Sequence, residues 1–171
     1  PAAEDVRPTK DVDIFLEIAS YSRLTELQQK IAKKGFTPAV EEKIMCRFQY
    51  EDVLVDIMST KDVGWAKADK WFEPGLRNLE KIKIDDMEIN ILHISYFLAT
   101  KFNAFHDRTE EARVSRHFED IVYLFDNRLN IVQEIIESTN DVKNYLITEF
   151  KELLKREAQE AILAHLPYDM Q

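Results

Sequence analysis

The chain has 171 residues, of which 45% are hydrophobic, and its formal net charge is −9. This amount of apolar material predicts one ordinary globular domain with a distinct helical half. The negative charge argues against broad electrostatic adhesion to nucleic acid, because that mode of binding relies on neutralisation of phosphates by Lys and Arg. No segment approaches the roughly 18 consecutive apolar residues of a membrane helix, so we expect no membrane span.

Cysteine content and the amino terminus bear on the compartment. The single cysteine, Cys46, cannot form an internal disulfide, and we expect it to be a core thiol in a reducing cytoplasm. The chain opens at Pro1 without an initiator Met and without a basic-then-apolar leader. We therefore expect native residues to precede Pro1, and we do not expect a secretory precursor.

The first elements are a strand and a helix. Residues 12–19 (VDIFLEIA) form a near-continuous apolar run that is typical of a buried strand. Residues 21–35 (YSRLTELQQKIAKKG) then place apolar side chains at helical spacing, and we expect Gly35 to be the C-cap.

Two hairpins are predicted next. Residues 46–50 and 53–58 are rich in β-forming side chains, and the pair Glu51 and Asp52 between them suits a tight turn. Residues 81–92 alternate around a second acidic pair and predict another short hairpin. The sheet is therefore expected to be small and mixed.

Helical periodicity dominates from Ser95 onward. Ser95 and Ser115 are the expected N-caps of two helices, and the last helix is expected to run from about Val142 to Leu166 before Pro167 stops it. The predicted fold class is therefore α+β, with an α+β core in residues 1–94 and a helical subdomain in residues 95–171.

Three aspartates are candidate metal ligands. Asp11 and Asp13 lie two apart on a strand and so point the same way, while Asp56 sits in VLVDIM with two apolar residues on either side. An unpaired buried carboxylate costs several kcal/mol, so Asp56 needs a partner. If the two strands are neighbours, three carboxylates converge at one sheet edge and suit Mg²⁺ or Mn²⁺. The alternatives are a chance Asp-x-Asp and an Asp56 bonded to a nearby Lys or backbone amide.

The two helices that follow carry polar residues beside their apolar stripes. Lys101 and Arg108 lie two turns apart on one face, and His117 and Asp120 share a shoulder of the next helix. A pocket built from these four side chains would suit a triphosphate and an acceptor group. The alternative is a surface lysine and an ordinary salt bridge. Three histidines lack partners at metal-ligand spacing and are given no role: His93, His106 and His165.

Four segments resemble the nucleotidyltransferase superfamily, specifically its AbiEii/AbiGii toxin-like branch. They are RPTKDVDIFLEI, VLVDIM, YFLATKFNAFHDR and SRHFEDIVYLFDNR, and together they cover most of residues 7–128 in the family's order. The third is similar to the family's Lys-x-x-Ala-x-x-x-Arg helix motif. The resemblance implies a nucleotidyltransferase-like core that transfers a nucleoside monophosphate from an NTP to an acceptor hydroxyl, with pyrophosphate leaving.

The same resemblance implies roles for individual residues. Asp11 and Asp13 would hold Mg²⁺ or Mn²⁺, and Asp56 would add a third ligand or activate the acceptor hydroxyl. Lys101 would be catalytic and would bind phosphate. The other implied roles are phosphate binding by Thr9 and Arg108, and positioning of Lys101 or the acceptor by Asp120. His117 stands where many relatives carry an acid.

One family feature is not matched. The family places a Gly-Gly or Gly-Ser turn before the aspartate strand, where backbone N–H groups hold phosphates. This chain has three glycines, Gly35, Gly64 and Gly75, and none precedes Asp11. Either the turn lies upstream of Pro1 or the phosphate grip has been lost, and the Pro1 start favours the first.

Three functions follow from these observations. The first is an active nucleotidyltransferase, the toxin of a toxin–antitoxin pair, that acts on tRNA or on a protein hydroxyl. The second is a catalytically degenerate module that binds nucleotide or a partner protein. The third is a nucleotidyltransferase for a small antibiotic-like alcohol, which the net charge of −9 would suit if the alcohol were cationic.

Overall fold

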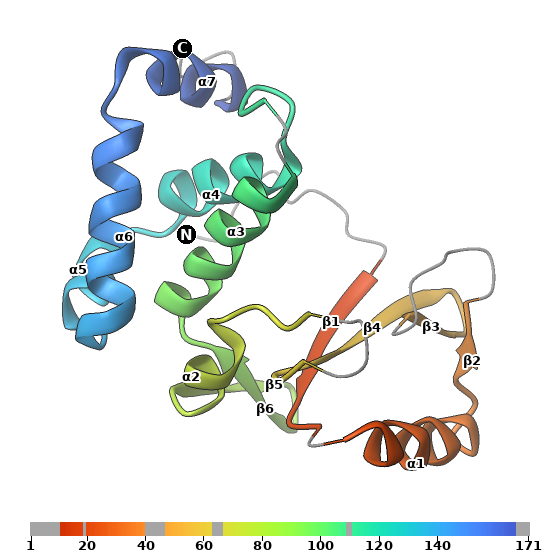
Figure 1. The fold of residues 1–171 in the computed structure, drawn as a ribbon. Coiled ribbons are helices and arrows are strands. Elements are labelled where there is room, and N and C mark those ends of the chain that lie inside the picture. The colour runs from red at the N-terminus through yellow and green to blue at the C-terminus, as the bar shows by residue number, and fades with distance from the viewer. Residues whose placement is uncertain (1–10, 19, 40–46, 63–66, 109–110, 167–171) are drawn as a thin grey trace. The chain divides into compact units, whose positions relative to one another are not determined.

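The structure is a computed structural model that describes residues 11–18, 20–39, 47–62, 67–108 and 111–166. It divides into two compact units, Pro1–Glu73 and Pro74–Gln171. The elements of both units are labelled in Figure 1. Among the residues that the structure describes, no helix has the length and apolar character needed to cross a membrane. Cys46 and Thr9 lie outside the described residues.

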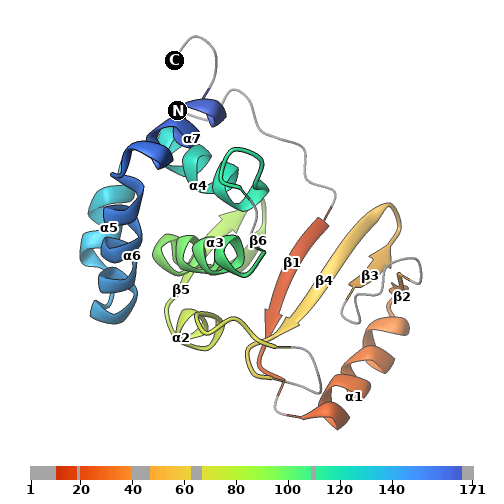
Figure 2. The same cartoon turned by 45° about the horizontal axis from the view of Figure 1, so that its top comes forward.

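The first unit holds a four-stranded mixed sheet with the strand order β1-β4-β3-β2. Its elements are β1 (Asp11–Leu16), α1 (Tyr21–Ala32), β2 (Thr37–Pro38), β3 (Arg47–Tyr50) and β4 (Val53–Ser59). β1 runs parallel to β4, whereas β4, β3 and β2 are antiparallel neighbours. The strand that carries the first two aspartates therefore lies beside the strand that carries the third, as both ribbon views show (Figure 1, Figure 2).

Apolar side chains on one face of this sheet pack against α1. Phe48, Val55 and Ile57 are buried, and Leu27 and Ile31 of α1 pack against them. Side chains alternate along a strand, so the residue between Val55 and Ile57 points to the opposite face. The α1 side of the sheet is thus apolar, and the opposite side carries Asp56 and its register partner Asp13.

The end of α1 differs from the prediction. The helix stops at Ala32, and its C-cap is Lys33, whose N–H donates to the carbonyl of Gln29. Gly35 follows in a left-handed conformation with φ of 96°, which any residue with a Cβ adopts at a cost. Gly35 therefore reverses the chain after the helix but is not the C-cap.

The second unit contains a hairpin followed by helices, and α2 (Phe72–Leu76) lies at the division between the units. Its elements are β5 (Leu79–Ile84), β6 (Met87–Leu92), α3 (Ile94–Arg108), α4 (Arg116–Asn127), α5 (Ile131–Glu137), α6 (Asn140–Leu153) and α7 (Arg156–His165). β5 and β6 form a separate two-stranded antiparallel sheet. The hairpin groups with the helices, so the division falls after residue 73, whereas the expected boundary was residue 94.

α3 is the central helix of the second unit. It packs against α4, α5 and α6, and Leu98 and Phe102 on α3 are almost completely buried. Val142 and Leu146 of α6 are also fully buried. Figure 2 shows α5 and α6 side by side along their length, and these two helices are in contact.

Both predicted hairpins are confirmed. Glu51 and Asp52 join β3 to β4, and Asp85 and Asp86 join β5 to β6. The first residue of each turn has positive φ, 51° at Glu51 and 52° at Asp85. Turns with positive φ at this position match the right-handed twist of paired strands, so both two-residue turns suit the hairpins that they close.

The start of α3 is not where it was expected. The helix begins at Ile94, so Ser95 lies in the first turn and is not the N-cap. His93 precedes the helix, and its Nδ1 accepts a hydrogen bond of 3.3 Å from the N–H of Ser95. The imidazole thus satisfies a terminal N–H that the preferred capping residues usually satisfy.

The last predicted helix is two helices. α6 ends at Leu153 and α7 begins at Arg156, with a bend at Leu154 and Lys155. α6 packs on α3, whereas Ala161 of α7 packs on Phe118 of α4. A straight helix cannot cover both neighbours, so burial of the two apolar faces outweighs the continuous helical pattern. The α+β class itself is confirmed.

Candidate functional site

The three predicted aspartates share one face of the first unit's sheet. Asp13 and Asp56 are register partners on the parallel strands β1 and β4. Asp11 lies two residues before Asp13 and therefore points to the same side. This side is opposite the one that packs on α1, because Val55 and Ile57 point to α1. The convergence expected at one sheet edge is therefore present in the backbone register.

An arginine that was not predicted sits among these carboxylates. Arg47 of β3 is the register partner of Asp56 across the hairpin. Its Nε donates to Oδ1 of Asp56 at 2.7 Å, and its Nη2 donates to Oδ2 at 2.8 Å. Nη2 also lies 3.7 Å from Oδ2 of Asp11. Asp56 therefore has the partner that its apolar surroundings require, and the partner is an arginine, not the lysine or backbone amide considered above.

The exposure of this group differs sharply among its members. The side chains of Arg47 and Asp56 are 14% and 15% exposed, whereas that of Asp11 is 48% exposed. Asp13 is also exposed. Burial strengthens the Arg47–Asp56 pair because less water screens it, and it makes removal of one partner costly, on the order of 3–5 kcal/mol for a fully buried pair.

The chemical type of these donors suits a divalent cation. Carboxylate oxygens are the ligands that Mg²⁺ prefers, and three of them stand on one face of two adjacent strands. Within the described residues, however, no three His, Cys, Asp or Glu side chains already converge closely enough to hold a metal ion. Both oxygens of Asp56 bond to Arg47, and Asp11 also lies within ion-pair distance of this arginine.

In the second unit, the predicted lysine and aspartate meet. Nζ of Lys101 on α3 donates to Oδ2 of Asp120 on α4 at 2.7 Å, and the two side chains are 19% and 22% exposed. The same ammonium lies 4.9 Å from the ring centroid of Phe97, within cation–π distance. The aspartate thus fixes the position of the lysine, as one of the two roles considered for it requires.

Arg108 is the last residue of α3, two helical turns after Lys101, and its side chain is exposed. One hollow among the described residues of this unit lies elsewhere on its helices. It is a cavity of about 490 Å³ with walls that include Phe102, Phe105, Phe118 and Leu153. Its lining, as far as the described residues go, does not include Lys101, Arg108 or Asp120.

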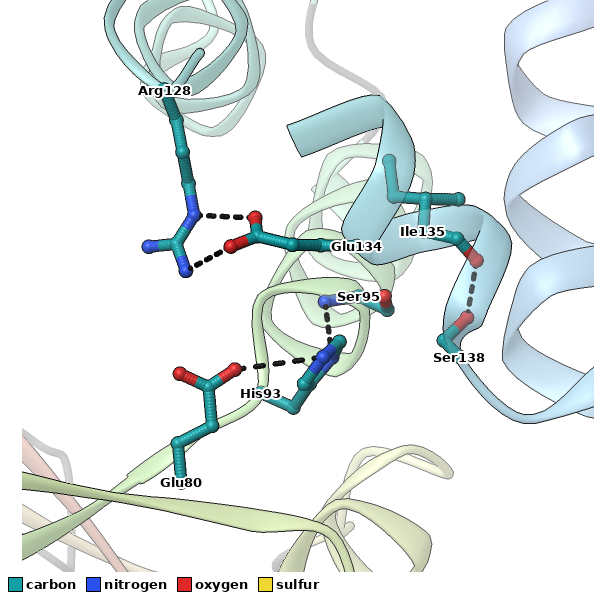
Figure 3. Close-up of polar contacts among 7 residues, drawn as sticks. All are labelled: Glu80, His93, Ser95, Arg128, Glu134, Ile135 and Ser138. Atoms are coloured by element: carbon teal, nitrogen blue, oxygen red, sulfur yellow. Dashed lines mark hydrogen bonds and ion pairs between the residues drawn. The ribbon is translucent and has the colours of Figure 1, made fainter. Parts of the chain in front are cut away.

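A second group of charged side chains joins four elements of the helical unit (Figure 3). Arg128, which follows α4, donates from Nε and Nη2 to the two carboxylate oxygens of Glu134 on α5, at 2.6 and 2.9 Å. Nε2 of His93 lies 3.5 Å from Oε1 of Glu80 on β5. His93, which was given no role from the sequence, thus contacts both the start of α3 and the hairpin.

These contacts shift two pKa values. The hydrogen bonds from Arg128 lower the pKa of Glu134 below its ordinary value, and proximity to His93 lowers it further, although partial burial opposes the shift. The bond to Glu134 raises the pKa of Arg128, and Glu80 contributes to the same direction. Two contacts therefore link these elements in pairs: Arg128–Glu134 joins the end of α4 to α5, and His93–Glu80 joins the start of α3 to β5.

The comparisons with known proteins decide the family. A family model described as "Nucleotidyl transferase AbiEii toxin, Type IV TA system" matches residues 3–168. The chain belongs to the AbiEii nucleotidyl transferase toxin family. The suspected AbiEii branch is thereby confirmed, and the family is one of nucleotidyl transferases that are toxins of type IV toxin–antitoxin systems. No curated protein and no solved structure matched the chain.

Arg47 is the residue of this AbiEii chain that sequence reasoning missed, although the signal was present. A two-residue turn at Glu51 and Asp52 fixes the register of the hairpin, and that register sets Arg47 opposite Asp56. Applied to CRFQY and VLVDIM, the same rule identifies the partner of the buried carboxylate from the amino-acid sequence alone.

Proposed function

We propose that this AbiEii-family chain is a metal-dependent nucleotidyltransferase that moves a nucleoside monophosphate from an NTP to an acceptor hydroxyl on tRNA or on a protein. In the cell it would be a cytoplasmic toxin opposed by an antitoxin. The family supports the transferase chemistry and the toxin–antitoxin context. The observation that best supports metal dependence is the register that sets Asp13 beside Asp56, on the face that also holds Asp11.

Asp11 and Asp13 are the proposed ligands of Mg²⁺ or Mn²⁺, and Asp56 is the proposed third ligand. The bound ion would neutralise phosphate charge and favour in-line attack at phosphorus. Lys101 is proposed to bind phosphate, and Asp120 keeps its ammonium in one place through the 2.7 Å ion pair. A fixed cation stabilises charge that develops on phosphate oxygens without reorganising during the reaction.

Arg108 and Thr9 complete the proposed phosphate-binding set. Arg108 is exposed at the end of α3, so its five N–H donors are open to a phosphate group. For Thr9 the proposal rests on the family motif alone.

Labelled nucleotide incorporation tests the proposal. Purified protein is incubated with each labelled NTP, Mg²⁺, and either total RNA or total protein from a cell extract. We expect one labelled product, loss of labelling when EDTA is added, and at least a hundredfold lower rate in Asp13→Asn, the scale expected when a key charge in an active site is removed. Asp52→Asn, in the exposed β3–β4 turn, is the matched control and should label normally. Absence of any labelled product with all four nucleotides and both acceptors would contradict the proposal.

The Arg47–Asp56 pair favours a second candidate function, nucleotide binding without turnover. A carboxylate whose two oxygens both bond to a guanidinium is a poor metal ligand and a poor base. Calorimetric titration with NTP and Mg²⁺, combined with a pyrophosphate assay, separates the candidates. Binding without pyrophosphate release favours the binding module, and release favours the transferase.

A further inference from the structure

We propose that Arg47 is a built-in counter-ion that occupies Asp56 in the metal-free protein and competes with the divalent cation for it. The inference rests on the proposed function, since it concerns the same carboxylate face. It assigns a role to a residue on β3 that the aspartate motif does not contain. In this scheme, the affinity of the site for metal is set by how readily the guanidinium leaves Asp56.

Arg47 contacts two of the proposed metal ligands, Asp56 and Asp11. Two of its nitrogens hold the two oxygens of Asp56, and one of them is 3.7 Å from Asp11. The guanidinium therefore lies between side chains of β1 and β4.

Charge and burial give the competition its strength. Arg is always protonated, so its positive charge cannot be removed by a change of pH. Its side chain is 14% exposed, so solvent screens its repulsion of a second cation only weakly. A divalent ion that binds Asp56 must either displace the guanidinium or tolerate a positive charge beside it. Either requirement weakens the binding of the divalent ion.

A counter-ion role for Arg47 also bears on the repulsion between neighbouring carboxylates. Asp13 and Asp56 are direct register neighbours, and like charges in that arrangement repel. A permanent cation hydrogen-bonded to one of them offsets this repulsion.

Titration with Mn²⁺ alone, followed by electron paramagnetic resonance of the free ion, tests the inference on the full chain without nucleotide. We expect Arg47→Met to lower the Kd for Mn²⁺ at least tenfold relative to the wild type. Arg23→Met is the matched control, because Arg23 lies in the same unit and pairs with Glu26 at the surface, and its Kd should equal that of the wild type. Adding Asp56→Asn to Arg47→Met should abolish the gain.

An Arg47→Met variant that is folded by circular dichroism but binds Mn²⁺ no more tightly than the wild type would overturn the inference. If that variant does not fold, Arg47→Lys is the deciding variant. Lysine keeps the positive charge but cannot form the bidentate hydrogen bond, so we expect a Kd for Mn²⁺ about threefold lower than that of the wild type. An unchanged or higher Kd overturns the inference. The proposed function fails separately. If no nucleotide is incorporated but Arg47→Met binds Mn²⁺ more tightly, the transferase is refuted and the counter-ion role of Arg47 is supported. If nucleotide is incorporated but Mn²⁺ affinity does not rise, the transferase is supported and the counter-ion role is refuted.

Discussion

Replacing Arg128 by Met should measurably destabilise the helical unit, because it removes both bonds between the end of α4 and α5. Nε and Nη2 of Arg128 lie 2.6 and 2.9 Å from the oxygens of Glu134, and the two side chains are 38% and 27% exposed. Hydrogen bonds to charged groups are worth about 1.5–3 kcal/mol, whereas exposed ion pairs are worth about 0.2–1 kcal/mol. For a pair that is roughly one-third exposed, we expect a coupling energy of about 1.5 kcal/mol.

A double-mutant cycle measures this coupling. The free energy of unfolding is determined by urea titration for the wild type, Arg128→Met, Glu134→Gln and the double variant. Far-UV circular dichroism is the probe, because α3 to α7 all belong to the second unit. The ion pair between Lys81 and Glu88 on the β5–β6 hairpin is the control. Both of its side chains are more than 60% exposed, so its coupling should stay below about 0.5 kcal/mol.

The coupling energy between Arg128 and Glu134 should also change with pH in a defined direction. The pKa of Glu134 is lowered in the folded protein from its ordinary value near 4.5, chiefly by the bond from Arg128. The unfolded chain therefore binds this proton first as pH falls. The coupling should be fully present above about pH 4.5 and lost as pH falls through the lower folded-state pKa. A coupling below about 0.3 kcal/mol at neutral pH, or one that does not decline in acid, would refute the reasoning.

Two further predictions concern helix starts and the core. Ser115→Ala should leave the free energy of unfolding unchanged or raise it, because this N-cap hydroxyl is buried without a hydrogen-bond partner. Ser20→Ala removes an acceptor for the N–H of Arg23, so it should lower the free energy of unfolding by about 0.5–1 kcal/mol in the same urea titration. Leu146→Ala should cost about 2–5 kcal/mol because the side chain is fully buried, and Ile147→Ala, the exposed neighbour on α6, should cost under about 1 kcal/mol; equal costs would contradict the assigned burial.

Local chemistry made parts of the fold predictable. The two acidic turns are short, and strong β-forming runs flank them. These two local signals were enough to predict both hairpins. The α+β order followed from the change of apolar spacing at about residue 93. The Asp13–Asp56 pairing was conditional on β1 and β4 being neighbours, a long-range contact that periodicity does not encode.

Tertiary packing decided what the sequence pattern did not. The apolar spacing continues through Leu154 and Lys155, yet the helix breaks there because α6 and α7 pack on different neighbours. His93 caps α3 where serine is the more usual cap, and its imidazole also lies 3.5 Å from Glu80 on the hairpin. The site was harder still. Its aspartates carried a motif, whereas Arg47 is marked only by its register with Asp56.

Among the strands that the structure describes, β1 lies at the edge of its sheet, and this affects how variants of the protein will behave in solution. An outer strand offers unpaired backbone groups to other molecules, and charged side chains are a common protection against such pairing. Val12 and Ile14 on β1 are already 50% and 37% exposed, so Asp11 and Asp13 supply most of the protection. Replacing both aspartates by alanine would therefore leave an uncharged, apolar edge strand and favour aggregation through strand pairing between chains. Asparagine, which keeps the shape and polarity of the side chain, is the safer substitution for separating lost chemistry from lost solubility.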